Sequence, residues 1–234
     1  MTTRATMHKP GITARTTTRV KLVQASDIVT TIPDGADGTP SNRWIDLRRN
    51  PDQIDLMDEL RGRPTLHEQV AMLNLPAGPF MTIACEAATT RLFQHGGSPA
   101  WRTSSSLQLV FADLLARCDL DNYVPLARAL LDGLGGDPNA TRWSRLVELR
   151  PNPVVSPSAG RLAWSLTIRT SAYGLDSGTS AHEWNLCVMI QTALIRSWTR
   201  LQDLDGMEFN SVSRASVGLR PAVAKMRSRA RSGK

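Results

Sequence analysis

The sequence predicts a mainly α fold with a small β element: a single helical domain flanked by extended N-terminal and basic C-terminal arms. Three observations support this prediction. Apolar residues recur every three or four positions in several segments, which is typical of amphipathic helices. One stretch alternates between apolar and polar residues with a period of two, as a half-buried strand does. The basic residues outnumber the acidic ones most strongly at the two ends of the chain.

Residues 1–43 are predicted to form an extended basic arm. The segment is rich in Thr, Arg, Gly and Pro and contains few large apolar residues. Only Val20–Val23 and Ile28–Ile32 hold enough β-branched residues to pair as short strands. Residues 33–40 carry turn-forming Pro, Asp and Gly. The chain therefore reaches its compact core only after residue 43.

Residues 44–208 are predicted to form a mainly helical core. Thr65 and Glu68 have the spacing of a capping box, in which each side chain bonds a free backbone N–H, so a helix is expected here that stops before Pro76. Phe80–Gln94 is predicted as a second helix, with an extended conformation at Met81–Ile83 as the alternative.

The next two segments are predicted to form an antiparallel helical hairpin. Apolar residues recur at three and four positions along 107–118, after the potential caps Ser104–Ser106. A second helix is expected from about Pro125 to the glycine pair Gly135–Gly136. The connection between the two helices, Asp119–Asn122, is short enough to bring them side by side.

A β-hairpin is predicted near 142–173. Leu162, Trp164 and the alternate residues up to Thr170 are separated by more polar positions, which indicates a strand with one buried face. Because a lone strand leaves backbone groups unpaired, it needs a partner. Trp143–Leu149 is the nearest candidate, joined through a proline-rich loop.

The longest apolar stripe follows a second capping box at Ser180 and Glu183. It is wide enough that either the core or a neighbouring subunit has to cover the helix on most sides. On this basis the sequence predicts an oligomer interface at four residues of the stripe: Trp184, Val188, Ile195 and Trp198.

The charge is unevenly distributed along the chain. The formal net charge is +7, to which residues 1–30 contribute +4 and residues 209–234 contribute +7, while the segment between them carries −4. An acidic body with cationic ends is suited to a polyanion or an acidic partner. Residues 209–234, the predicted basic C-terminal tail, contain no carboxylate side chain. A solubilising tail or a localisation peptide is the alternative interpretation of this segment.

Basic residues of the two arms are the predicted nucleic-acid-binding residues, because guanidinium and ammonium groups neutralise phosphates. They are Arg15, Arg19, Lys21, Arg220, Lys225, Arg227, Arg229, Arg231 and Lys234.

The sequence contains no motif for catalysis, a metal or a cofactor. The four histidines lie in separate segments without the ligand spacing of a zinc site. Asp203–Gly206 lacks the later ligands of a calcium loop and is better explained as a turn. No phosphate-binding loop or nucleophile elbow is present. We therefore predict no catalytic residue, metal or cofactor and expect a protein that is not an enzyme.

The location is expected to be a virion or a reducing intracellular compartment. The three cysteines, Cys85, Cys118 and Cys187, are odd in number and far apart, which argues against a secreted disulfide framework. No apolar run is long enough for a membrane span, and the N-terminus lacks a secretory signal. The Arg- and Thr-rich N-terminus has no acidic residue before Asp27, so import into an organelle stays open.

These patterns predict a structural nucleic-acid-packaging protein, such as a viral coat or nucleocapsid subunit. The expected partners are nucleic acid, with RNA favoured over DNA, and further copies of the chain as a homo-oligomer, with no membrane partner. One alternative is a phage tail or connector component that does not touch nucleic acid. Another is an organelle-targeted nucleic-acid-binding protein.

Overall fold

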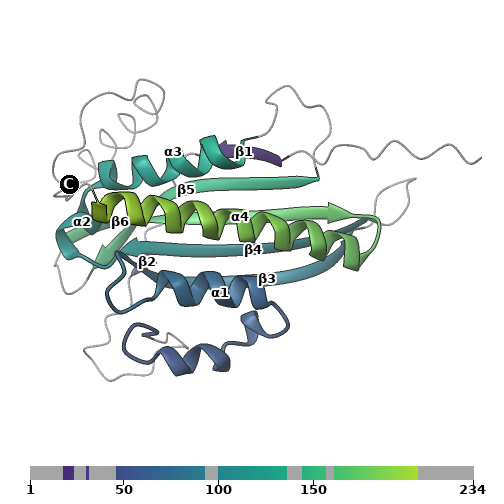
Figure 1. The fold of residues 1–234 in the computed structure, drawn as a ribbon, viewed down its shortest axis with the longest axis horizontal. Coiled ribbons are helices and arrows are strands. Elements are labelled where there is room, and N and C mark those ends of the chain that lie inside the picture. Colours follow the sequence, from purple (N-terminus) through teal and green to yellow (C-terminus); the bar gives the residue numbers. More distant parts are fainter. Residues whose placement is uncertain are drawn as a thin grey trace, which may run out of the picture.

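The computed structural model describes residues 18–23, 30–31, 46–92, 100–135, 144–156 and 161–204. Within this part of the chain the fold is a twisted β-sheet with helices packed on one of its faces (Figure 1). The mainly α prediction is therefore wrong, and the fold class is α/β. The helices were largely foreseen, but most of the sheet was not.

The sheet contains six described strands, of which four long ones form its centre. The strand order is β1-β5-β6-β4-β3, and β2 pairs with the far end of β5. β1 and β2 run parallel to β5, whereas the remaining neighbours are antiparallel. The strands are β1 (Thr18–Leu22), β2 (Thr30–Thr31), β3 (Phe80–Leu92), β4 (Ala100–Phe111), β5 (Arg145–Ser156) and β6 (Arg161–Gly174).

The centre of the sheet is made of two units of the same kind. In each, a β-hairpin is followed by helical structure: β3 and β4 precede the short helix α2 and helix α3, and β5 and β6 precede α4. The second strands of the two hairpins, β4 and β6, are antiparallel neighbours in the middle of the sheet. This arrangement puts residues about 65 positions apart in the sequence side by side.

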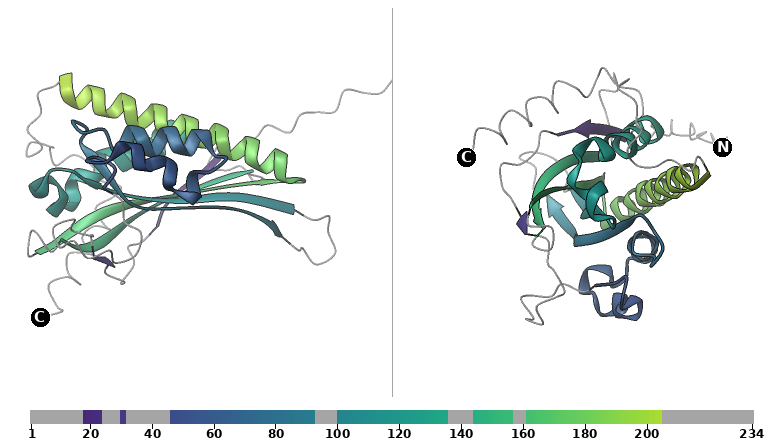
Figure 2. Two further views of the ribbon diagram at one scale, coloured as in Figure 1. Left: turned by 90° about the horizontal axis from the view of Figure 1, so that it is seen from below. Right: turned by 90° about the vertical axis from the view of Figure 1, so that its left-hand side faces the viewer.

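Three helices cover one face of the sheet, with α4 lying along its length (Figures 1 and 2). Their bounds are α1 (Pro64–Leu73), α3 (Tyr123–Leu134) and α4 (Ser177–Leu204). The shorter elements are α2 (Leu114–Cys118) and the 3-10 turns η1 (Pro51–Leu56), η2 (Asp58–Leu60) and η3 (Leu120–Asn122). Seen edge-on, α1, α3 and α4 lie above the sheet (Figure 2).

The main core fills the space between the helices and the sheet. Phe80, Phe111 and Trp198 form a cluster whose ring centroids are 5.0 to 6.4 Å apart. Tyr123 packs edge-on against Phe111 at 4.7 Å and donates a hydrogen bond to the carbonyl oxygen of Trp164. Burial of these rings joins the two hairpin units through one shared apolar layer.

The predicted helix at 80–94 is wrong, because strand β3 occupies most of these residues. The predicted helix at 107–118 is wrong in its first half, which belongs to β4, whereas Leu114–Cys118 forms the short helix α2. In β4 the core-facing side chains include Leu107 and Leu109, a spacing of two, and Thr103 and Ser105 continue the buried row. Two buried polar residues in that row hide the alternation from a reading of hydrophobicity. Their hydroxyls are satisfied by α4 instead of by water.

The helices that were predicted correctly begin at different residues from those expected. α1 starts at Pro64 without a side-chain cap, and the hydroxyl of Thr65 instead contacts the Asn185 side chain of α4. α4 starts at Ser177, where the Asp176 carboxylate accepts a hydrogen bond from the Thr179 amide at 2.7 Å. This acceptor satisfies a free N–H of the first helical turn, so Asp176 performs the capping role expected of Ser180.

The structure contains the predicted hairpin, formed by β5 and β6. Its far end departs from the expected pattern, because Leu162 is 41% exposed while Ala163 is fully buried. Ala163 joins Val110 and Val154 in a small second apolar cluster on the face opposite the helices. At this end of the sheet that face is therefore apolar, and its polar residues lie along the rest of the strands.

Candidate functional site

The face of the sheet opposite the helices, called the open face from here on, carries the most distinctive polar surface. The alternation of each strand defines it: in β4, Thr103, Ser105 and Leu107 are buried toward the helices. Their neighbours Arg102, Ser104 and Ser106 point the other way, because successive side chains of a strand project to opposite faces.

One row of side chains crosses the whole open face. The register places Lys21 opposite Glu148, Glu148 opposite Arg169, Arg169 opposite Ser106, and Ser106 opposite Glu86. Neighbouring strands are about 4.8 Å apart, so each residue of the row lies beside the next. Residues from five strands are thereby brought into line.

Basic groups outnumber acidic ones on the open face. Among the residues that the structure describes, none of these basic side chains forms an ion pair within 4.0 Å. The ion pairs of the described chain lie instead among the helices and turns or at the edge of α4. The basic residues are Arg19, Lys21, Arg102, Arg150 and Arg169, and the acidic ones are Glu86 and Glu148.

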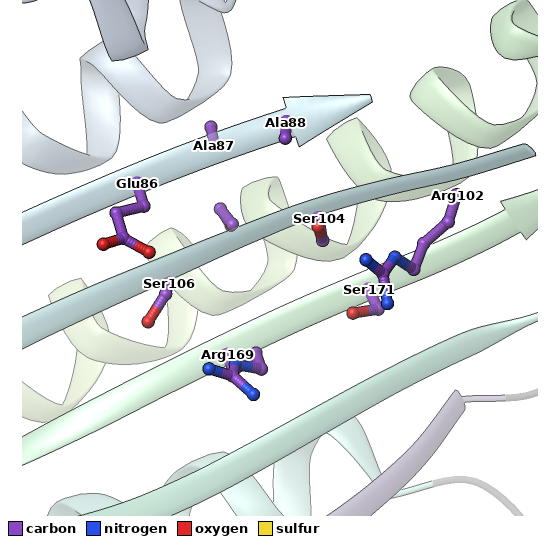
Figure 3. Close-up of a pocket in the computed structure, with 9 residues that line it drawn as sticks. Glu86, Ala87, Ala88, Arg102, Ser104, Ser106, Arg169 and Ser171 are labelled. Carbon is purple, nitrogen blue, oxygen red and sulfur yellow. The ribbon is translucent and has the colours of Figure 1, made fainter. Parts of the chain in front are cut away.

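A pocket of about 290 Å³ lies on this face where β3, β4 and β6 adjoin (Figure 3). Arg102 and Arg169 lie on either side of a group of serines, and Glu86 occupies the β3 side. The lining side chains on the open face are Glu86, Ala88, Arg102, Ser104, Ser106, Arg169 and Ser171, with parts of Ala87 and Ser105 at the floor.

Arg102 is the most unusual group of the pocket. Its Nε is shielded from solvent and has no hydrogen-bond partner among the described residues. A buried donor without an acceptor costs about 1–3 kcal/mol. The guanidinium can therefore donate a hydrogen bond to an anionic oxygen of a ligand. Figure 3 shows the guanidinium beside Ser171.

The three outward serines differ from Ser105, which looks similar in sequence. Ser105 faces the helices, where its hydroxyl accepts a hydrogen bond from Trp184 Nε1 at 3.1 Å. Ser104, Ser106 and Ser171 line the pocket, and in the strand register Ser104 and Ser171 lie between the two arginines. Guanidinium and hydroxyl groups together form the kind of donor set that binds phosphate oxygens.

The pocket is lined by guanidinium, hydroxyl and carboxylate groups. Its lining contains no histidine or cysteine. In the described part of the chain, no three His, Cys, Asp or Glu residues lie close enough to hold a metal ion. Burial raises the pKa of the Cys187 thiol to about 11 and that of Cys85 to about 12, so both stay protonated near neutral pH and are poor nucleophiles.

Two of the predicted nucleic-acid-binding residues, Arg19 and Lys21, lie on β1. Val20 and Leu22 pack against the core, so Arg19 and Lys21 project from the other side of the strand, onto the open face. The remaining predicted residues, Arg15, Arg220, Lys225, Arg227, Arg229, Arg231 and Lys234, lie outside the described residues.

The four residues expected at an oligomer interface lie in the core of their own chain. Trp184, Val188 and Ile195 are at most 1% exposed, and Trp198 is 9% exposed. The sheet and the neighbouring helices of the same chain cover the wide apolar stripe of α4. The sequence had left open whether the core or a neighbouring subunit does so. The large apolar side chains that α4 does expose are Met189, Ile190 and Leu201.

Sequence reasoning missed the pocket residues. Arg169 was within reach, because it falls on the polar side of the predicted strand at 161–170. Arg102 gave a weak signal, because an arginine beside Trp101 can help to clamp a stacked base, although a tryptophan anchor was the favoured interpretation. Ser104 gave none, because Ser104–Ser106 were interpreted as caps of a helix. Their convergence depends on the pairing of β4 with β6, for which no local signal exists.

No described helix combines the length and the apolar character that crossing a bilayer requires. Comparisons of the chain with protein-family models, with curated proteins and with solved structures found no match.

Proposed function

We propose that this protein is a structural nucleic-acid-packaging subunit, of the viral coat or nucleocapsid kind, that self-assembles and neutralises phosphates with basic side chains. RNA is the favoured nucleic acid. The observation that carries the proposal is the surplus of basic groups on the open face, which have no ion-pair partner in the described part of the chain.

The physical basis is counterion release. Each phosphate neutralised by a lysine or arginine frees a condensed cation, and the entropy gained favours binding. Groups that are already paired with carboxylates have less to gain, since binding would break those pairs. The open face supports the proposal because its cations are available, and its breadth lets a flexible single strand cross several β-strands.

The charge of the chain ends supports the same function. β1 brings the basic N-terminal segment to the open face through Arg19 and Lys21. The last 26 residues add seven basic side chains and no carboxylate side chain. A folded basic face combined with a cationic tail increases the number of phosphates that one subunit neutralises.

A salt titration of binding to single-stranded RNA tests the proposal. Removal of residues 221–234 takes away five basic side chains, which should reduce the slope of log K against log salt by about 3.5. The triple variant Arg19→Gln, Lys21→Gln, Arg150→Gln should reduce it by about 2.

The matched control removes the same charge from the helical side. Arg49→Gln, Arg61→Gln and Arg200→Gln replace exposed arginines of that side and should leave the slope almost unchanged. Light scattering of the full chain should show RNA-dependent growth in mass. A full-length protein that fails to bind RNA even at low salt would refute the packaging function.

A further inference from the structure

We propose that the pocket between Arg102 and Arg169 is a discrete site for one ribonucleotide unit of a single-stranded RNA. The backbone phosphate is held between the two guanidinium groups, and the ribose 2′-hydroxyl is held by Glu86. The inference rests on the proposed function and deepens it, because it names the substrate class and the residues that recognise it.

The strand register defines the phosphate position. Ser104 of β4 lies opposite Ser171 of β6, and this pair forms the middle of the pocket. Arg102 precedes Ser104 by two residues on β4, and Arg169 precedes Ser171 by two residues on the antiparallel strand. The two arginines therefore approach the serine pair from opposite corners, with Cα atoms about 14 Å apart by strand geometry.

The unsatisfied donor indicates what belongs between them. Arg102 Nε is buried and lacks an acceptor among the described residues, although the neighbouring hydroxyls of Ser104 and Ser171 line the same pocket. A phosphate has two free oxygens with several lone pairs, so it can accept from Arg102, from Arg169 and from serine hydroxyls at once. A neutral ligand would gain little from the two guanidinium charges.

Glu86 restricts the other end of the pocket. Glu86 on β3 lies opposite Ser106 of β4, at the end of the row that contains Arg169. An ionised carboxylate only accepts hydrogen bonds and repels a second phosphate. A hydroxyl is the favoured neighbour, and the 2′-hydroxyl is the donor that an RNA backbone has and a DNA backbone lacks.

The location on an open sheet favours a polymer over a free nucleotide. Arg150, Arg19 and Lys21 lie on the same face on the neighbouring strands β5 and β1. A chain whose one phosphate occupies the pocket can place its next phosphates near these groups. The pocket then fixes the register of the RNA strand on the open face, while the surrounding cations supply affinity that does not depend on the position of the RNA.

The first experiment separates a discrete site from general attraction. Binding of a short, dye-labelled oligouridylate to the full chain is measured by fluorescence anisotropy at near-physiological salt. Arg102→Gln should weaken binding about tenfold. Arg150→Gln removes the same charge from the same face outside the pocket and should weaken binding about twofold. Circular dichroism and thermal melting check that both variants keep the wild-type fold.

Equal losses for the two variants would overturn the discrete site. That result would leave the packaging function intact, provided that the tail truncation and the triple variant still reduce the salt slope on long RNA. The two proposals therefore fail in distinguishable ways.

The second experiment tests the ribose contact with matched oligouridylate and oligodeoxyuridylate. The wild-type chain should prefer RNA about tenfold, in keeping with the loss of one hydrogen bond to a charged group. Glu86→Ala should abolish this preference, whereas Glu148→Ala, which removes an acidic group elsewhere on the face, should leave the preference unchanged. A preference that survives Glu86→Ala would overturn the assignment of Glu86.

Discussion

The two faces of the sheet differ in how their polar side chains are hydrogen-bonded and paired. On the helix-covered face, the two buried polar residues in the row of β4 are paired: Thr103 bonds to Ser180 at 3.0 Å, and Ser105 bonds to Trp184. On the open face, the buried Nε of Arg102 has no partner among the described residues, and its neighbouring cations have no ion pair there. On the covered face, folding itself supplies the hydrogen-bond partners of these residues. On the open face, a ligand can supply the missing partners.

The largest expected difference between the faces appears in two neighbouring residues of β4. Leu107 is 1% exposed on the covered face, so Leu107→Ala should reduce the free energy of unfolding by about 3 kcal/mol, through lost burial and a cavity. Ser106→Ala on the open face should change it by no more than about 0.5 kcal/mol. Urea denaturation measures both, and similar values for the two variants would contradict the division into faces.

Ion pairs give a second, smaller contrast. Arg145 Nη2 and Glu183 Oε2 are 2.7 Å apart, with side chains only 12% and 16% exposed. Glu183→Ala leaves the guanidinium poorly solvated and should cost about 2 kcal/mol, less than for a fully buried pair because some solvent access persists.

The control is the exposed pair Arg196–Glu68 at 3.1 Å, whose side chains are 45% and 63% exposed. Glu68→Ala should cost less than about 1 kcal/mol in the same urea assay. A larger loss for Glu68→Ala than for Glu183→Ala would show that burial does not decide the strength of these pairs.

The smallest expected effect is a pH dependence of the covered core. Burial raises the pKa of Cys187 from its ordinary value of 9.0 to about 11, so the folded state disfavours the thiolate. The stability associated with the protonated thiol is fully present below pH 9 and is lost as the pH rises toward about 11. The loss should amount to roughly 1–2 kcal/mol.

Other groups also titrate in this range, so the comparison uses variants. Cys187→Ala should show a shallower decline of unfolding free energy between pH 9 and 11 than the wild-type chain, and Cys118→Ala serves as the control thiol. Parallel declines in the wild-type chain and Cys187→Ala would show that Cys187 is not the group responsible.

Elements whose apolar residues are strictly periodic could be predicted from the sequence. α3 and α4 follow helical spacing, and most of β6 alternates as expected. β3 and β4 could not be recognised in this way. The covered face of β4 buries Thr103 and Ser105, whose hydroxyls are satisfied by residues 77 and 79 positions further along the chain.

The candidate site was only partly predictable, because some of its residues are recognisable by their local charge and others depend on the pairing of distant strands. Arg19 and Lys21 were selected by charge alone, and β1 places them on the open face. Arg169 and Glu86 carry no motif, and Arg102 stands out in the sequence only because it follows Trp101. They become a site only when β3, β4 and β6 pair in one register, because that pairing brings them to a common pocket.

By itself, the sequence determined the period of the strongest helices, one β-hairpin, and the excess of cations at both chain ends, since these depend on residues near one another in the chain. Only the tertiary structure decided the α/β fold, the burial of the α4 stripe within its own chain, and the pocket. These features arise from hydrogen bonding and packing between distant segments, whose free energy no local pattern records.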